Sequence, residues 1–122
     1  MAVALAVGVA GALGAVARYL LDGAVQDRTS GLFPFGTLSV NVVGSFILGL
    51  VAGLVLWRGV SGTLETIVGA GFCGGLTTWS TVSWETVRLA EEGAARDALG
   101  SLVANLAASL LAAAAGLALG WR

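Results

Sequence analysis

The sequence contains no histidine and no lysine, and it has one cysteine and one proline in 122 residues. Without histidine, the chain cannot build the histidine-based metal, haem or acid–base sites that many enzymes use. Lysine, another common base, is also missing, and no carboxylate is paired with a candidate nucleophile, so an intramembrane enzyme is disfavoured. The single cysteine, Cys73, cannot form an internal disulfide and is expected to be a small buried apolar residue.

Charged residues are scarce as well, at 11% of the chain, whereas apolar residues make up 57%. This composition lies far outside the soluble range and is typical of an integral membrane protein. Four apolar segments can span a bilayer, at about residues 2–21, 37–57, 64–89 and 99–121. The sequence therefore predicts one all-α domain over residues 1–122, with four transmembrane helices. Its net charge of −1 gives no reason to expect a nucleic-acid partner.

The third apolar segment, residues 64–89, is longer than one span requires. As an unbroken helix it would reach roughly 39 Å, whereas the hydrocarbon core is about 30 Å thick. Four glycines lie between residues 69 and 75, and a run of hydroxyl residues follows them directly. Because glycine weakens helices, we expect a break near Leu76 and Thr77, with released backbone groups close to the bilayer midplane. Those groups need partners inside the protein or in a water-filled cavity.

Polar residues recur at helical spacing in the second and fourth segments. Each stripe places an amide between two hydroxyls at positions i, i+4 and i+8. An amide this far inside a span is costly if it faces lipid, so Asn41 is expected either to bind a partner helix or to line a water-filled path. The two stripes are Thr37, Asn41 and Ser45 in the second segment and Ser101, Asn105 and Ser109 in the fourth.

The few arginines bear on two questions, namely the role of Arg18 and the way in which two chains assemble. Arg18, the only charge in the first segment, either extends to the lipid headgroups or faces an aqueous vestibule where it attracts anions. Arg58 and Arg122 lie on the side of the termini, whereas Arg28 and Arg96 lie in the opposite loops. This weak bias permits insertion in both orientations. Since so short a chain can hardly enclose a path alone, the sequence predicts a dimer, which the weak bias allows to be antiparallel.

Three blocks of sequence occur in order over nearly the whole chain. They are Gly-Ala-Val-Ala-Arg-Tyr at 14–19, Phe-Pro-Phe-Gly-Thr-Leu-Ser-Val-Asn-Val-Val-Gly-Ser at 33–45 and Gly-Phe-Cys-Gly-Gly-Leu-Thr-Thr-Trp-Ser-Thr at 71–81. Together they resemble the CrcB or Fluc family of fluoride channels. The resemblance implies a passive fluoride exporter of the inner (plasma) membrane, built as an antiparallel dual-topology dimer with two pores along the subunit interface.

The resemblance also implies site residues. A structural sodium ion at the dimer centre would be held by backbone carbonyls of Gly74 and Thr77. We expect the fluoride path to comprise Asn41, Trp79, Ser80, Thr81, Asn105, Ser109, Arg18 and Thr37.

Two positions depart from the family pattern. Trp79 replaces the usual phenylalanine, which keeps an aromatic edge and adds an N–H, and Val82 stands where a second phenylalanine is expected. The missing ring leads to the hypothesis that this chain pairs with a different homologous subunit, or conducts more slowly as a homodimer. A non-conducting partner subunit is a further alternative. A small multidrug exporter would need a carboxylate buried in its first span, and the first segment has no acid before Asp22.

Overall fold

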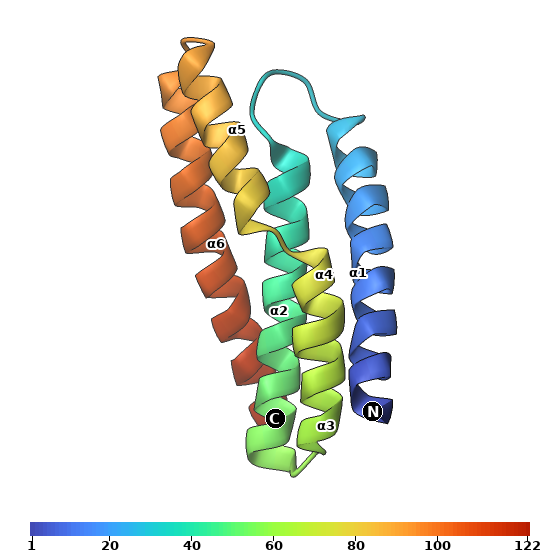
Figure 1. Cartoon of the computed structure of the whole chain (residues 1–122). Helices are drawn as coiled ribbons and strands as arrows, with labels where there is room; N and C mark the ends of the chain where they lie inside the picture. Colours follow the sequence, from blue (N-terminus) through green and yellow to red (C-terminus); the bar gives the residue numbers. More distant parts are fainter.

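The computed structural model describes all 122 residues and contains helices but no strand. Long helices alternate in direction, so that both termini lie at one end of the molecule (Figure 1). The elements in chain order are α1 (Ala2–Gln26), α2 (Phe35–Arg58), α3 (Gly62–Glu65), η1 (Thr66–Cys73), α4 (Gly74–Leu76), α5 (Trp79–Glu91) and α6 (Ala95–Trp121). The all-α prediction is therefore confirmed.

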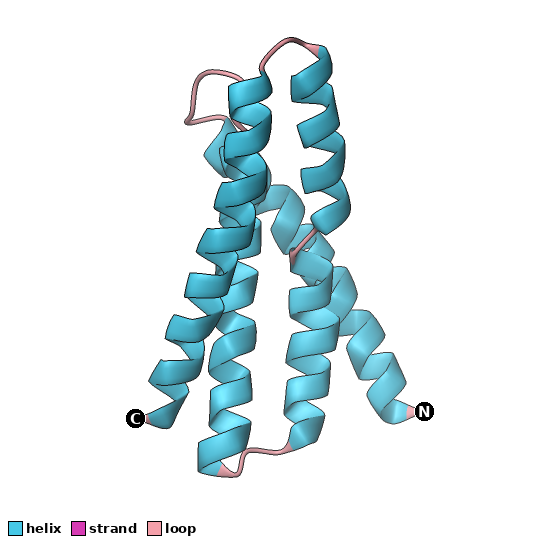
Figure 2. Cartoon of the chain, turned by 90° about the vertical axis from the view of Figure 1, so that its left-hand side faces the viewer, coloured by secondary structure: helices cyan, strands magenta, loops and turns pink.

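Three of these helices, α1, α2 and α6, are long and apolar enough to cross a membrane. The remaining stretch is an interrupted helix, in which α3, η1 and α4 form the first half and α5 forms the second (Figure 2). The interruption falls at Thr77 and Thr78, immediately after the Gly-Gly-Leu run where the sequence predicts it. The first half is itself irregular, because η1 is a π-helix whose wider turns change the direction of the side chains that follow.

The helix α1 packs against the interrupted helix through glycine. A Cβ atom on Gly14 would lie 2.1 Å from the carbonyl oxygen of Phe72, and one on Gly75 would lie 2.2 Å from the carbonyl oxygen of Gly11. Any larger residue would collide with backbone at these two positions. Glycine at the contact lets backbones approach closely, as in the small-residue seams of membrane helices. This contact holds α1 beside the break.

The helices α2 and α6 form a second glycine contact, lower in the view of Figure 1. A Cβ atom on Gly49 would lie 2.1 Å from the carbonyl oxygen of Ala113, and one on Gly116 would lie 2.2 Å from the carbonyl oxygen of Phe46. Near the end of both helices, the rings of Trp57 and Trp121 stack with centroids 5.6 Å apart. The α2–α6 pair is thus tight at the end that carries the termini.

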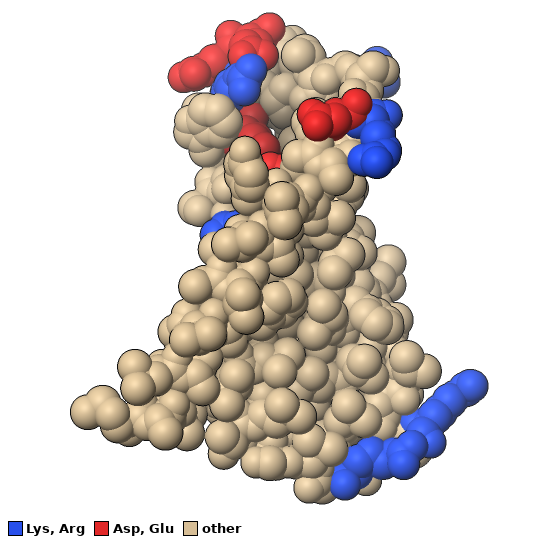
Figure 3. Space-filling view, turned by 90° about the vertical axis from the view of Figure 1, so that its right-hand side faces the viewer, with Lys and Arg blue, Asp and Glu red and all other residues tan.

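A single chain buries little of itself: only 22 of its 122 residues are buried, and large apolar side chains along α1 and α6 are exposed. Charged side chains gather mostly at the two ends of the molecule, with a broad uncharged band between them (Figure 3). Leu5, Val9 and Leu13 on α1 and Leu110 on α6 are all at least 60% exposed. Such surfaces suit lipid or a second protein chain.

Candidate functional site

The break consists of two residues with extended backbone. Thr77 has φ −83° and ψ 158°, and Thr78 has φ −154° and ψ 116°. Thr78 caps α5, because its Oγ1 accepts a hydrogen bond from the N–H of Thr81 at 3.2 Å. A hydroxyl at this position satisfies one of the N–H groups that a helix start leaves without a partner. The Thr-Thr-Trp-Ser-Thr sequence thus ends one half-helix and begins the next.

Asn41 of α2 binds the break from the opposite side. Its Oδ1 accepts a hydrogen bond from the N–H of Thr78 at 2.7 Å, and its Nδ2 donates to the carbonyl oxygen of Thr78 at 3.1 Å. The same Nδ2 donates to Oδ1 of Asn105 on α6 at 2.8 Å. Asn105 in turn donates from Nδ2 to the carbonyl oxygen and to Oγ of Ser101, at 2.9 and 3.4 Å. One buried network therefore joins three elements at the break.

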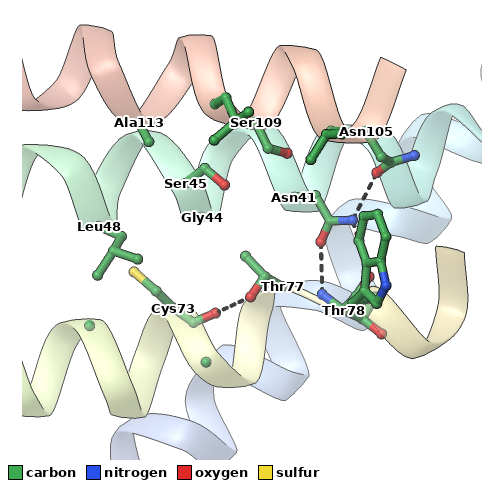
Figure 4. A pocket seen from close by; sticks show the side chains of 15 residues that line it. Asn41, Gly44, Ser45, Leu48, Cys73, Thr77, Thr78, Asn105, Ser109 and Ala113 are labelled. Carbon is green, nitrogen blue, oxygen red and sulfur yellow. Dashed lines mark hydrogen bonds between the residues drawn. The ribbon is translucent and has the colours of Figure 1, made fainter. Parts of the chain in front are cut away.

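A cleft of about 370 Å³ lies beside this network, between the interrupted helix, α2 and α6 (Figure 4). Its wall contains amides, hydroxyls, glycines and apolar side chains but no charged residue. The half-buried hydroxyls of Ser45 and Ser109 line it and have no hydrogen-bond partner within the chain. The lining residues are Asn41, Gly44, Ser45, Leu48, Gly69, Cys73, Gly74, Thr77, Thr78, Trp79, Asn105, Leu106, Ser109, Leu110 and Ala113.

Six of the ten residues predicted from the sequence line this cleft, namely Asn41, Gly74, Thr77, Trp79, Asn105 and Ser109. Ser80 and Thr81 do not line it, although their hydroxyls lie 3.2 and 2.9 Å from Oγ1 of Thr78. Thr78 itself is the residue that sequence reasoning missed. A threonine directly before a helical segment is the sequence signal of an N-cap, and Thr78 stands directly before α5.

Arg18 contacts the break from α1. Its Nη1 donates to the carbonyl oxygen of Thr77 at 3.4 Å, so the guanidinium reaches a backbone group that the break has released. Arg18 is not part of the cleft wall.

Thr37 also lies outside the cleft, in a buried contact nearer the end of the molecule. Its Oγ1 donates to Oε1 of Glu85 at 2.8 Å, and the buried Oε2 of Glu85 has no partner. Glu85 borders a separate polar pocket of about 250 Å³ together with Asp22 and Arg88. Hence two residues predicted to share one path, Thr37 and Asn41, belong to different contacts within this chain.

The two residues that depart from the family pattern lie in opposite environments. Trp79 borders the cleft and is 55% exposed, whereas Val82, one turn further along α5, is completely buried. The side chain at position 82 therefore packs inside this chain.

These features define a multi-pass α-helical membrane protein with an interrupted helix beside an uncharged cleft that mixes polar groups with apolar side chains, and interrupted helices of this kind occur in transporters. Residues 5–117 match the family described as "CrcB-like protein, Camphor Resistance (CrcB)", so the chain belongs to that family. The resemblance noted in the sequence is thereby confirmed.

Named relatives are similar over most of the chain. A "Fluoride-specific ion channel FluC 1" of Leifsonia xyli subsp. xyli is 50% identical over 118 residues, covering 97% of this chain and 86% of the relative. Proteins named "Fluoride-specific ion channel FluC 2" are 47% identical in Haloarcula marismortui, covering 94% of this chain and 87% of the relative, and in Cutibacterium acnes, covering 93% of each. The family is thus one of ion channels and not of enzymes.

Proposed function

We propose that this chain forms a fluoride-selective channel that lowers cytoplasmic fluoride by passive export across the inner (plasma) membrane. The observation that carries the proposal is the cleft beside the break, whose wall offers hydroxyls and the first turn of α5 but no charged side chain. The similarity to relatives named fluoride-specific ion channels supports the choice of ion.

The chemistry of the wall suits a small, strongly hydrated anion. A selective path must replace the water around fluoride with hydrogen-bond donors, yet it must also release the ion. Hydroxyls such as that of Ser109, backbone N–H groups and the edge or N–H of Trp79 can do this without a full positive charge that would trap the anion. Arg18, close behind the break, adds a positive potential that attracts anions to the mouth of the path.

A dimer completes the proposed channel. The cleft is open in a single chain, and most large apolar side chains on the outer helices are exposed. The weak charge bias between the two ends fits insertion in both orientations, so we infer four membrane crossings per chain and an antiparallel pair with two paths along its interface. Since Val82 is buried and adds no ring to the cleft, a heterodimer with a homologous subunit is the alternative to a homodimer.

A structural sodium ion is part of the proposal. The Thr78 N–H, which would bond the carbonyl of Gly74 in a continuous helix, instead donates to Asn41, and the carbonyl of Thr77 accepts only from Arg18. Backbone carbonyl oxygens, each of which has two lone pairs, are ligands that hard cations prefer. Gly74 and Thr77 would supply two carbonyl oxygens per chain, and in an antiparallel dimer two copies would offer four. Bound sodium would supply positive charge that holds these carbonyls together.

Efflux from liposomes tests the channel. The purified chain alone should release trapped fluoride quickly and chloride far more slowly when a potassium ionophore balances charge, with protein-free liposomes as the control. Equal release of both ions would contradict selectivity. No fluoride release from the chain alone, restored by a homologous subunit, would favour the heterodimer, and no release with either subunit would favour a non-conducting partner.

Thermal unfolding tests the sodium site independently of transport. Replacing sodium with a large organic cation at constant ionic strength should lower the melting temperature of the dimer. An unchanged melting temperature would contradict a structural role for sodium.

A further inference from the structure

We propose that the joined ends of α2 and α6 bind the headgroup of an anionic phospholipid. Arg58 and Arg122 contact the lipid phosphate, and the indole rings of Trp57 and Trp121 lie beside the glycerol region. The proposal requires that the chain spans a membrane, and it does not depend on the ion that the chain conducts.

Glycine contacts bring the two tryptophans of this site together. A Cβ atom on Gly53 would lie 2.6 Å from the carbonyl oxygen of Leu117, and one on Gly120 would lie 2.8 Å from Cα of Gly53. Trp57 follows Gly53 by about one helical turn, and Trp121 is the next residue after Gly120. The two rings therefore stack, with centroids 5.6 Å apart and an interplanar angle of 22°. Both tryptophans are exposed, so the stack is part of the surface.

Each tryptophan is followed directly by an arginine whose side chain has no partner. Arg58 and Arg122 are exposed, and neither guanidinium forms an ion pair or a hydrogen bond within the chain. Because the preceding rings stack, the two arginines extend from neighbouring points of the surface. A guanidinium can donate two parallel hydrogen bonds to the oxygens of a phosphate. A phosphate group is therefore the ligand that this pair of arginines fits.

Acidic residues are nearly absent from this end of the molecule. Of the seven acidic residues, only Glu65 lies at the end that carries the termini. Figure 3 shows the same contrast on one face, where acidic atoms gather at the top and the basic atoms at the bottom have none beside them. An anionic headgroup is therefore attracted to the ends of α2 and α6. The other six acidic residues are Asp22, Asp27, Glu85, Glu91, Glu92 and Asp97.

The side chains at both helix ends follow the order of the parts of a phospholipid. The exposed leucines Leu56 and Leu119 come before the tryptophans, and the arginines come last. Leucine suits the acyl chains, tryptophan suits the membrane–water interface, and arginine extends to the headgroups. The same lipid molecule can therefore contact all three kinds of side chain.

This lipid site is separate from the cleft. The cleft wall ends at Leu48 on α2 and at Ala113 on α6. Trp57 lies nine residues beyond Leu48, and Trp121 lies eight residues beyond Ala113. At 1.5 Å per residue, these separations are roughly 12–13 Å along the helices. A partner subunit that covers the cleft can therefore leave the ends of α2 and α6 open to lipid.

Thermal unfolding of the purified protein in detergent, with added lipid, tests the site without any ion flux. Phosphatidylglycerol should raise the melting temperature with an apparent affinity about 30-fold higher than that of phosphatidylcholine, because two arginines favour the anionic headgroup. Arg58→Gln/Arg122→Gln should lose this preference. The matched control, Arg28→Gln/Arg96→Gln, removes two arginines from the opposite end and should keep it.

Three results would overturn the proposal. The first is an equal response of the wild-type protein to both lipids, or a preference that survives in Arg58→Gln/Arg122→Gln. The second is a lower melting temperature of this variant by the same amount in either lipid, which would assign the arginines to a contact with the partner subunit. The third is equal stabilisation by inorganic phosphate, which would make the ligand a free anion. A lipid preference without fluoride release would refute the proposed function alone.

Tryptophan fluorescence in phosphatidylcholine vesicles provides a second measurement that needs no arginine variant. Phosphatidylglycerol with brominated acyl chains should quench the wild-type emission more strongly than brominated phosphatidylcholine at the same mole fraction. Trp57→Phe/Trp121→Phe keeps two aromatic rings and should lose this excess quenching, whereas the control Trp84→Phe, on α5, should retain it. No excess quenching in the wild-type protein, or excess quenching that persists in Trp57→Phe/Trp121→Phe, would contradict the site.

Discussion

Replacing Gly14 with alanine tests the contact that places α1 beside the break. The added Cβ would lie 2.1 Å from the carbonyl oxygen of Phe72 and 3.0 Å from the N atom of Leu76. Both are backbone atoms, so no side-chain rotation can relieve the collision. Ordinary contact begins at 3.4 Å, so α1 would have to move away by the difference from 2.1 Å, about 1.3 Å. We expect the overpacking to cost about 1–3 kcal/mol.

The control for this substitution is Gly8→Ala on the same helix. Nothing lies within 4 Å of a Cβ at Gly8, so this variant gains the same helix propensity, up to about 1 kcal/mol, without any collision. The difference in unfolding free energy between the variants therefore isolates the steric cost at Gly14. It can be measured by SDS titration in mixed micelles, followed by far-UV circular dichroism. A Gly14→Ala protein as stable as Gly8→Ala would refute the close packing of α1 on the break.

Three further predictions concern stability and accessibility. Thr37→Val should destabilise the protein by about 1–3 kcal/mol in the same titration, because it leaves both carboxylate oxygens of Glu85 without a hydrogen-bond partner. A loss of stability smaller than that caused by an exposed Thr→Val substitution would contradict this contact. Glu92→Gln should change the free energy of unfolding by less than about 1 kcal/mol, because the ion pair between Glu92 and Arg88 is exposed. A larger loss would show that this ion pair supports the fold. The side chain of Cys73 is only 2% exposed, so it should react slowly with a maleimide in the folded protein and readily after unfolding. Rapid labelling of the folded protein would contradict the burial of Cys73.

The sequence predicted the helical class and the break from properties that depend only on neighbouring residues. Apolar length identifies membrane helices because a span must cover a fixed thickness of hydrocarbon. The break followed from glycines that weaken a helix and from a segment too long for one straight span. For the same reason, the polar stripes on α2 and α6 were recognised, since each lies within one regular helix.

Side-chain directions beyond the break could not be predicted in the same way. The π-helical turns of η1 and the two extended residues Thr77 and Thr78 change the helical phase between the halves. Periodicity therefore cannot be carried from Gly74 to α5, and the sequence did not decide that Val82 faces the inside of the chain while Trp79 is exposed. Helix spacing alone also placed Thr37 with Asn41 on one stripe, although they bind different partners.

The sequence by itself thus determined that this is a helical membrane protein with an interrupted segment, and it identified the family. Only the tertiary structure decided which polar groups are already paired and which remain free. Asn41 meets Thr78 and Asn105 across 37 and 64 positions of the chain, and such pairings arise from the way separate helices pack. The physical reason is that an amide has few donors, so its role depends on which neighbours the fold brings within about 3 Å.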